Sequence, residues 1–136
     1  MIEQRQCGSC GTNGMERAVR DVSRDFQGQT LTIPAVDGWH CPACGEVEFA
    51  DGEEASRFFA AAQAAQQEAA RQQAQTIRAI RSRLGLTQKQ AADLLGGGVN
   101  AFSEYERGVT RPSKSTLLLL KLLDRHPELM QEARRL

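Results

Sequence analysis

The stretch LTQKQAADLLGGGVNAFSEYERG, residues 86–108, decides the fold of the C-terminal half. Thr87 precedes an apolar-periodic segment and Gln90 follows three residues later, which is the sequence pattern of a helix-capping box. Three glycines at residues 96–98 predict a tight turn, and residues 99–107 predict a second helix that ends at a glycine. Two short helices around such a turn are typical of the helix-turn-helix motif, whose second helix enters the major groove of DNA.

Further helices are predicted on both sides of this motif. Apolar residues recur at helical spacing from residue 76, and Gly85 predicts the end of that first helix. Ser113 caps a strongly apolar fourth helix, and Pro127 opens a short fifth one. The pattern therefore predicts an all-α, five-helix domain. A phosphate-binding loop would need Lys-Ser/Thr after the glycines and a strand before them, and this sequence has neither.

The third helix carries the side chains expected to meet DNA bases. Asn100 is predicted to read a base, because Asn can bond adenine at two points. Glu104 lies on the same face and can accept a hydrogen bond from a cytosine amine, whereas Glu106 lies off that face and is expected to pair with a basic side chain on the surface. Phosphate contacts are expected from polar and basic residues around these helices: Gln88, Lys89, Arg107, Arg111 and Lys114.

The apolar residues of the last helices also predict an interface between two copies of the chain. Helix-turn-helix proteins commonly reach two half-sites of DNA as dimers. The fourth helix has more leucine than one side of a small core needs, so a homodimer seam is predicted at these residues: Leu117, Leu120, Leu123, Leu129 and Met130. The alternative, in which they all pack inside their own chain, stays open. Phe102 and Tyr105 are interpreted as packing residues.

The N-terminal half contains all four cysteines of the chain, in the pairs CGSC and CPAC separated by 30 residues: Cys7, Cys10, Cys41 and Cys44. Two such pairs can close a tetrahedral shell of four thiolates around zinc. One structural Zn²⁺ per chain is predicted, because a closed shell leaves no position for a substrate. Two disulfides are disfavoured in a reducing compartment, and a redox site would need one CxxC at the start of a helix.

A small β-hairpin module is predicted between the cysteine pairs. Residues 15–26 and 30–40 have strand character around the turn QGQ, and Pro34 predicts an edge or a bulge in the second strand. The module has few large apolar side chains, so a bound metal would supply folding energy that its core lacks. Trp39 is expected to pack over the metal site, and His40 is interpreted as a neighbour of the metal rather than a ligand.

The two halves are joined by a segment rich in Ala and Gln. Asp51 is predicted to cap a helix that begins near Glu53, which then becomes a solvated connector; the same composition is also compatible with a flexible linker. The sequence therefore predicts an α+β protein of two domains, with a zinc-binding domain at residues 1–70, a linker at 71–75 and a helix-turn-helix domain at 76–136.

Charge is divided unequally between the halves of this 136-residue chain, whose net charge is zero. Residues 1–75 carry six Lys and Arg against eleven Asp and Glu, a net charge of −5, and residues 76–136 carry eleven against six, a net charge of +5. A basic half suits a polyanion, and an acidic half suits a basic protein. No apolar run approaches the ~20 residues of a membrane span and no signal peptide opens the chain, so a cytoplasmic protein without membrane contact is expected.

These motifs together resemble the MqsA (YgiT-type) antitoxins of bacterial type II toxin–antitoxin systems. The matching features are the two CxxC pairs, the stretch at residues 86–108 and the segment LLKLLDRHPELM near the end. The resemblance implies a zinc module that binds and neutralises an MqsR-type toxin, a ribonuclease that cleaves messenger RNA. It also implies a helical module that dimerises and represses its own operon, with Asn100 as a base reader.

Glu104 departs from this family pattern, in which the position is basic, so the resemblance does not fix the operator sequence. The function expected from the sequence is a non-enzymatic antitoxin and repressor. A stand-alone zinc and helix-turn-helix regulator without a toxin partner is the alternative, and a thiol redox enzyme is a third class that metal analysis would test.

Overall fold

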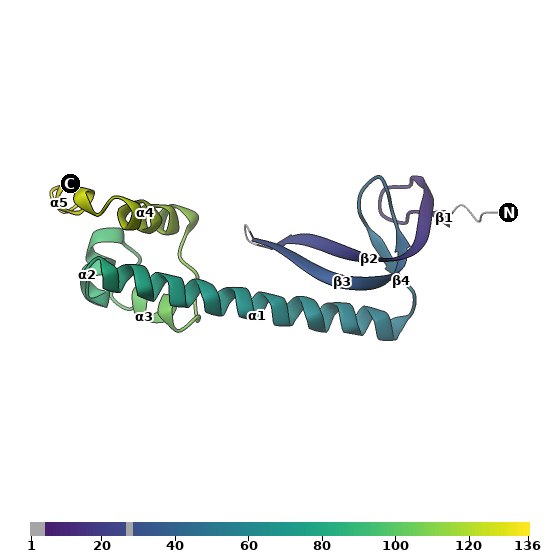
Figure 1. The fold of residues 1–136 in the computed structure, drawn as a ribbon, viewed down its shortest axis with the longest axis horizontal. Helices are drawn as coiled ribbons and strands as arrows, with labels where there is room; N and C mark the ends of the chain where they lie inside the picture. The colour runs from purple at the N-terminus through teal and green to yellow at the C-terminus, as the bar shows by residue number, and fades with distance from the viewer. Residues whose placement is uncertain (1–4, 27–28) are drawn as a thin grey trace. The chain divides into compact units, whose positions relative to one another are not determined.

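The computed structural model describes residues 5–26 and 29–136 (Figure 1). It divides into two compact units, Met1–Gln67, called unit 1, and Glu68–Leu136, called unit 2. Unit 1 contains the β-sheet and unit 2 is helical, which confirms the predicted α+β class. In the described part of the chain, no helix combines the length and the apolar character that crossing a bilayer requires.

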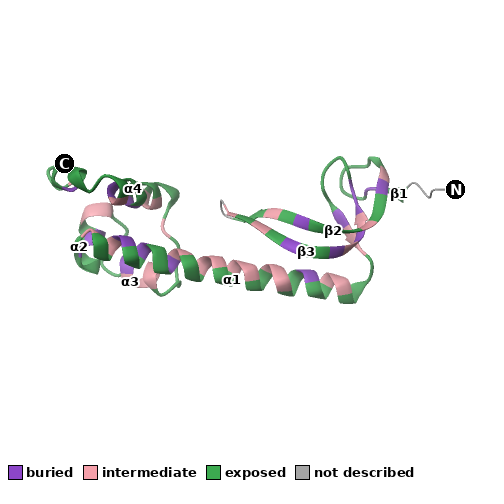
Figure 2. Cartoon of the chain, viewed as in Figure 1, coloured by how far each residue is buried: buried purple, intermediate pink, exposed green. Residues whose placement is uncertain are grey.

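Unit 1 is built on an antiparallel sheet of order β1-β2-β3-β4. The strands are β1 (Arg5–Gln6), β2 (Asn13–Phe26), β3 (Gln29–His40) and β4 (Val47–Phe49). The long strands β2 and β3 form the predicted hairpin, and Figure 2 shows both buried and exposed residues along them. The predicted turn QGQ includes residues 27–28, which lie outside the described residues.

An irregularity interrupts the pairing of β2 and β3 where Pro34 predicted a bulge. Arg20 pairs with Val36, but the next pair is Val22 with Ile33. At this point Ala35 has a φ of 52°, in the left-handed region, and its N–H donates to the Asp21 carboxylate at 2.9 Å. Because proline has no backbone N–H, Pro34 cannot donate a hydrogen bond to the neighbouring strand, and the regular pairing is interrupted at this residue.

Helix α1 (Gly52–Arg83) begins directly after Asp51, the capping residue that the sequence indicated. The Asp51 carboxylate accepts the backbone N–H of Glu54 at 2.8 Å, and the Glu54 side chain accepts the N–H of Asp37 in β3 at 2.9 Å. The hydrogen bond from Arg57 and then that from Asp37 lower the pKa of Glu54 to about 2. The helix thus packs Phe58 onto a core of unit 1 whose other buried members are Val22, Ile33, Val36 and Val47.

Residues 71–75, predicted as a linker, are helical and belong to α1. The first helix predicted for the C-terminal half is the last part of this same helix, so it does not begin at residue 76 as expected. The physical reason lies in the composition, since Ala, Gln, Glu and Arg are strong helix formers and no Gly or Pro occurs between residues 53 and 84. The units divide after Gln67, inside α1.

Unit 2 packs the end of α1 with α2 (Gln88–Leu95), α3 (Ala101–Glu106), α4 (Lys114–Arg125), the 3₁₀ turn η1 (Pro127–Leu129) and α5 (Met130–Ala133). Both predicted caps are present: the Thr87 hydroxyl accepts the N–H of Gln90 in a capping box, and Ser113 accepts the N–H of Thr116. The core centres on Phe102, Ile77 and Leu120, which are almost completely buried.

Candidate metal centre and nucleic-acid interface

The pairing of β2 with β3 brings the two cysteine pairs together. Cys7 and Cys10 lie in the loop between β1 and β2, and Cys41 and Cys44 lie in the loop between β3 and β4. At the base of these loops Glu16 pairs with His40, so the two loops leave the sheet side by side. Residues more than 30 positions apart thereby form one cluster, in which all four sulfur atoms lie within 4.8 Å of one another.

The two cysteine loops have the same backbone turn. In the first, the N–H of Cys7 donates to Thr12 and its carbonyl accepts the N–H of Gly11, both at 2.9 Å. In the second, Cys41 makes the equivalent bonds to Glu46 and Gly45 at 2.9 and 3.1 Å. The two glycines have φ of 74° and 75°, a left-handed conformation that favours glycine. Each loop therefore presents two thiols in the same way, one buried and one exposed.

The sulfur geometry fits a tetrahedral metal ion. The Cys7–Cys44 sulfurs are 3.8 Å apart and the Cys10–Cys41 sulfurs are 3.7 Å apart. A tetrahedron with metal–sulfur bonds of about 2.3 Å has edges of about 3.8 Å. A disulfide would require about 2.05 Å between the sulfurs, and all four thiols are free. The four cysteines are thus placed to bind one metal ion, as predicted.

The ionisation of the thiols also calls for a cation at their centre. Hydrogen bonds from the side chain and then the backbone of Thr12 lower the pKa of Cys10 to about 6. The backbone hydrogen bond at Glu46 acts to lower the pKa of Cys44, but desolvation and the other three thiols raise it to about 12. Four neighbouring thiolates repel one another, so a central metal ion is what would hold all four ionised.

The side chains around this cluster have the roles that the sequence indicated. The His40 Nε2–H donates to the carbonyl oxygens of Ala18 and Val36, each at 3.1 Å, so this ring holds the hairpin together and is not part of the metal cluster. Trp39 packs against Cys7, Met15 and Cys41, and the Arg5 guanidinium lies 5.3 Å from the centre of its ring.

In unit 2, the turn between α2 and α3 depends on glycine. Residues 96–98 have φ of 84°, 100° and 91°, which side chains disfavour. A Cβ atom on Gly97 would also lie 2.8 Å from the Tyr105 hydroxyl and 2.9 Å from the Cβ of Ala101. The turn therefore places Gly97 so close to Ala101 and Tyr105 of α3 that only glycine fits at this position.

The exposed start of α3 carries an amide that makes no bond to its own helix. Asn100 occupies the N-cap position, yet its side chain accepts no capping hydrogen bond and is exposed to solvent. One turn later, Glu104 is half-buried and accepts a hydrogen bond from the Thr110 hydroxyl at 3.3 Å. Asn100 and Glu104 share one face, while Phe102 and Tyr105 pack in the core, as the sequence predicted.

Glu106 has a partner that sequence reasoning did not identify. It was expected to pair on the surface, but its side chain is only 6% exposed and forms an ion pair with Arg81 of α1. Gln88, predicted to contact phosphate, donates to the same carboxylate at 3.0 Å. Burial acts to raise the pKa of Glu106, but the hydrogen bonds from Arg81 and Gln88 outweigh it and keep this pKa below its usual value. Arg81 follows Ile77 by four residues on the apolar stripe of the helix, a position that marks it as facing inward.

The remaining predicted phosphate contacts are solvent-accessible. Lys89, Arg111 and Lys114 are exposed, and within the described residues none of them forms an ion pair. Arg107 is exposed as well, but its Nε–H donates to the carbonyl and hydroxyl oxygens of Ser103 at 3.2 and 3.3 Å. Of the predicted DNA contacts, Lys89, Arg111, Lys114 and Asn100 are therefore exposed and, among the described residues, in no ion pair.

Comparison with known proteins identifies the family of this chain. The family model described as the antitoxin component of a bacterial toxin–antitoxin system, MqsA, matches residues 5–134. This chain belongs to the MqsA antitoxin family. A relative, Antitoxin MqsA of Escherichia coli (strain K12), is 37% identical over 131 residues, which are 95% of this chain and 99% of the relative. A solved structure of the N-terminal domain of the E. coli protein MqsA covers 48% of this chain and 96% of its own, with a TM-score of 0.41 and 23% identity.

This MqsA family member uses most of its predicted dimer residues inside its own core. Leu120, Leu123 and Met130 are 1%, 2% and 8% exposed, and Leu117 is half-buried against them, so of the predicted set only Leu129 is exposed. The correction has a simple cause, because the apolar residues of α4 cover more than one of its faces and the core takes the face that includes Leu120. The leucines that α4 and η1 leave exposed are Leu118, Leu119, Leu122 and Leu129.

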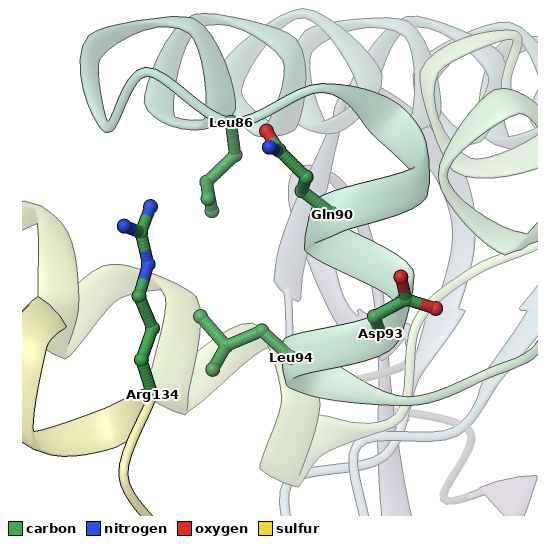
Figure 3. Close-up of a pocket in the computed structure, with 5 residues that line it drawn as sticks. All are labelled: Leu86, Gln90, Asp93, Leu94 and Arg134. Carbon is green, nitrogen blue, oxygen red and sulfur yellow. The ribbon is translucent and has the colours of Figure 1, made fainter.

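A hollow of about 400 Å³ also lies in unit 2, between α2 and the C-terminal segment (Figure 3). Leu86 and Leu94 form its apolar part, Gln90 and Asp93 project from α2, and Arg134 extends beside the two leucines. Gln90 is committed locally, since its side chain accepts the N–H of Thr87 in the capping box.

Proposed function

We propose that this chain is an antitoxin that neutralises an MqsR-type ribonuclease toxin through unit 1 and represses its own operon through unit 2. The observation that carries the proposal is the exposed, unbonded amide of Asn100 at the start of α3, directly after a glycine-dependent turn. Asn at this point of a helix-turn-helix meets a base edge in the major groove and can bond adenine at two points. The protein acts by binding and not by catalysis, in the cytoplasm where its operon and the toxin's RNA lie.

The metal in this proposal is a structural Zn²⁺ held by the four thiolates. Zinc prefers tetrahedral sulfur ligands, and a closed shell of four leaves no position for a substrate. Its contribution is to the folding of unit 1, whose larger apolar cluster contains five buried residues among those the structure describes. The cysteines therefore stabilise the surface that binds the toxin and take no part in a reaction.

Unit 2 binds DNA as a homodimer in this proposal. Leu118 and Leu122 are 57% and 44% exposed and lie one helical turn apart on α4, so they form an apolar strip that a second copy can cover. Two copies place two α3 helices against successive half-sites of one duplex. Leu122→Glu would put a carboxylate in this seam without touching the core.

The proposal is tested with the full chain, its own promoter duplex and the toxin encoded beside it. We expect tight binding to the promoter, weaker binding to a shuffled duplex of equal length, and inhibition of RNA cleavage at about one antitoxin per toxin. Leu122→Glu should yield a monomer that binds the promoter weakly and still inhibits the toxin. Equal affinity for the two duplexes would overturn the repressor function. Specific DNA binding without toxin inhibition would favour a stand-alone regulator.

A further inference from the structure

Unit 1 has an exposed aromatic cleft that neither the metal centre nor the DNA-binding surface uses. This cleft, here called the Phe59 cleft, has a volume of about 170 Å³ and lies between the β2–β3 hairpin and α1. Its apolar lining consists of Phe26, Leu31, Phe58, Phe59 and Ala62, and Arg24, Gln63 and Gln66 also border it. Cofactor and drug-sized sites are larger, roughly 300–1,000 Å³, so its size suits a single side chain of another protein.

The Phe59 ring of the cleft is held in place although it faces solvent. Phe59 is 63% exposed and Phe26 is 42% exposed. The Phe59 ring nevertheless packs edge-on against Phe58 and Phe49, with centroid distances of 5.6 and 5.8 Å. A partner therefore binds these rings at a low cost in side-chain entropy, which is typical of the central residues of protein interfaces.

The charges of unit 1 indicate which kind of partner fits. Residues 1–67 contain five Arg and no Lys against ten Asp and Glu, a net charge of −5. Four of the arginines are already in ion pairs, at Glu48, Asp37, Glu16 and Glu54. The fifth, Arg24, donates to the backbone carbonyls of Ser23 and Gly45.

Several carboxylates of unit 1 therefore keep their charge uncompensated. Among residues 5–26 and 29–67, the acids that form no ion pair are Asp21, Asp25, Glu46, Asp51 and Glu53. The unit thus presents net negative charge together with a rigid apolar anchor point. A second copy of unit 1 carries the same charge and would be repelled, whereas a basic protein would be attracted.

We propose that the Phe59 cleft is the docking site of the toxin, and that the toxin is a basic protein which inserts an apolar side chain between Phe26 and Phe59. This inference rests on the proposed function, since it names the surface through which unit 1 neutralises its partner. Apolar contact in the cleft sets the lifetime of the complex, and the acidic surface of unit 1 raises the rate of association.

The apolar part of the proposal is tested by titrating the purified toxin of the operon against the full chain. Phe59→Ala should weaken binding at least about tenfold, because it removes the exposed ring of the cleft. The matched control is Val19→Ala, which truncates a residue of unit 1 that is 61% exposed and lies outside the cleft, and it should leave affinity within about twofold. Metal content and melting temperature are measured for both variants, to show that each is folded.

The charge part is tested at Gln63, which is exposed and borders the cleft. Gln63→Glu should speed association and Gln63→Arg should slow it, with both effects shrinking as salt is added. Equal association rates for the two variants, or faster association of Gln63→Arg, would show that the partner is not basic.

The possible failures are distinguishable. If the wild-type chain does not bind the toxin, the toxin-binding part of the proposed function falls and this inference falls with it. If the wild type binds and Phe59→Ala binds equally well, the cleft is not the docking site while the proposed function stands. If Phe59→Ala instead changes the sedimentation of the chain alone, the cleft belongs to a contact between copies and the proposal is wrong.

Discussion

At the scale of single residues, α3 carries two carboxylates with different fates. Glu106 is neutralised by Arg81 and Gln88 inside unit 2, so it presents little charge to a polyanion. The Glu104 carboxylate accepts a hydrogen bond from the neutral hydroxyl of Thr110, lies on the face that holds Asn100, and forms no ion pair among residues 5–26 and 29–136. One acid on this helix is thus a packing residue, and the other is available for base selection.

Substitution of Glu104 is expected to change which base pair is preferred. A carboxylate accepts a hydrogen bond from a cytosine amine, whereas an arginine donates two to guanine and is attracted to phosphate. Glu104→Arg should therefore raise affinity for DNA and shift the preference at one position toward guanine. Selection from a randomised duplex library would reveal the shift, with Thr110→Val as a control that frees Glu104 and keeps its charge. An unchanged preference and affinity would place Glu104 away from the groove.

Substitution of Asn100 should affect DNA binding without affecting the stability of the fold. An Asn at a helix N-cap commonly stabilises the helix, but here its side chain makes no capping bond. Asn100→Ala should thus leave thermal stability nearly unchanged, while it costs about 1–3 kcal/mol of specific binding and relaxes base choice at one position. Anisotropy titrations against the promoter and its single-base variants measure this. Unaltered discrimination at every position would contradict the assignment.

At the scale of elements, the glycine turn between α2 and α3 fixes the orientation of α3. Gly97 and Gly98 both have positive φ, but only Gly97 has atoms within 3 Å of where a Cβ would lie. Gly98→Ala should cost about 1–2 kcal/mol of unfolding free energy from the backbone alone. Gly97→Ala should cost more and also weaken DNA binding, because Tyr105 or Ala101 must move. Urea unfolding of both variants provides the comparison, and equal losses would show that the close contacts are relieved without cost.

The contact of α1 with α3 predicts a dependence on acid. The folded-state pKa of Glu106 is lowered from its usual 4.5, so its ionised form stabilises unit 2 above that pH. This contribution is lost as the pH falls through the lowered pKa, since the protonated acid pairs poorly with Arg81. Glu106→Gln should be less stable than the wild type at neutral pH and lose less stability on acidification below 4.5.

The only tyrosine of the chain, Tyr105, lies in unit 2 and gives an optical signal for its unfolding. Glu132→Gln serves as the control, because it removes an exposed carboxylate from the same unit. If Glu106→Gln and the wild type lose stability in parallel on acidification, the ion pair does not stabilise the fold.

How far the sequence predicts an element depends on whether its signals are local. Thr87 with Gln90, and Ser113 with Thr116, define the starts of α2 and α4 within one turn, and both predictions are confirmed. The sides of α4 could not be assigned in the same way, because leucines surround much of the helix and only packing decides that Leu120 faces inward and Leu118 outward. The continuation of α1 through residue 76 was also missed, since helical periodicity does not show where one long helix passes from one unit to the next.

At the scale of the whole molecule, the two units should respond differently to loss of the metal. Only unit 1 contains the cysteines, and unit 2 has a core of its own. A strong chelator, or Cys41→Ser, should unfold unit 1, because structural zinc contributes folding energy directly. Unit 2 should remain helical and keep most of its DNA binding. Trp39, the only tryptophan, reports on unit 1 and Tyr105 reports on unit 2.

Metal analysis of the untreated protein should find about one zinc per chain. A metal-free protein whose Trp39 keeps its native, half-buried environment would contradict the structural role. Simultaneous loss of both optical signals with the chelator would show that the units do not fold independently.

The metal cluster was predictable in its residues but not in its assembly. Two CxxC pairs indicate four sulfur ligands wherever the chain places them. That the loops meet depends on the pairing of Glu16 with His40, a long-range register that no local pattern determines, although Pro34 did indicate the irregularity in β3. The exposed aromatic cleft was beyond sequence reasoning for a similar reason, because Phe26 and Phe59 come from a strand and a helix that only the folded unit brings together.

The shared turn of the two cysteine loops has a consequence for how this protein is made. Side chains alternate along a strand, so a hairpin closed one position out of step would point each loop away from its counterpart. Such a chain could offer an ion only two sulfurs at a time and would hold it weakly. A metal ion bound by all four thiols would therefore favour molecules whose strands are correctly aligned over misaligned ones.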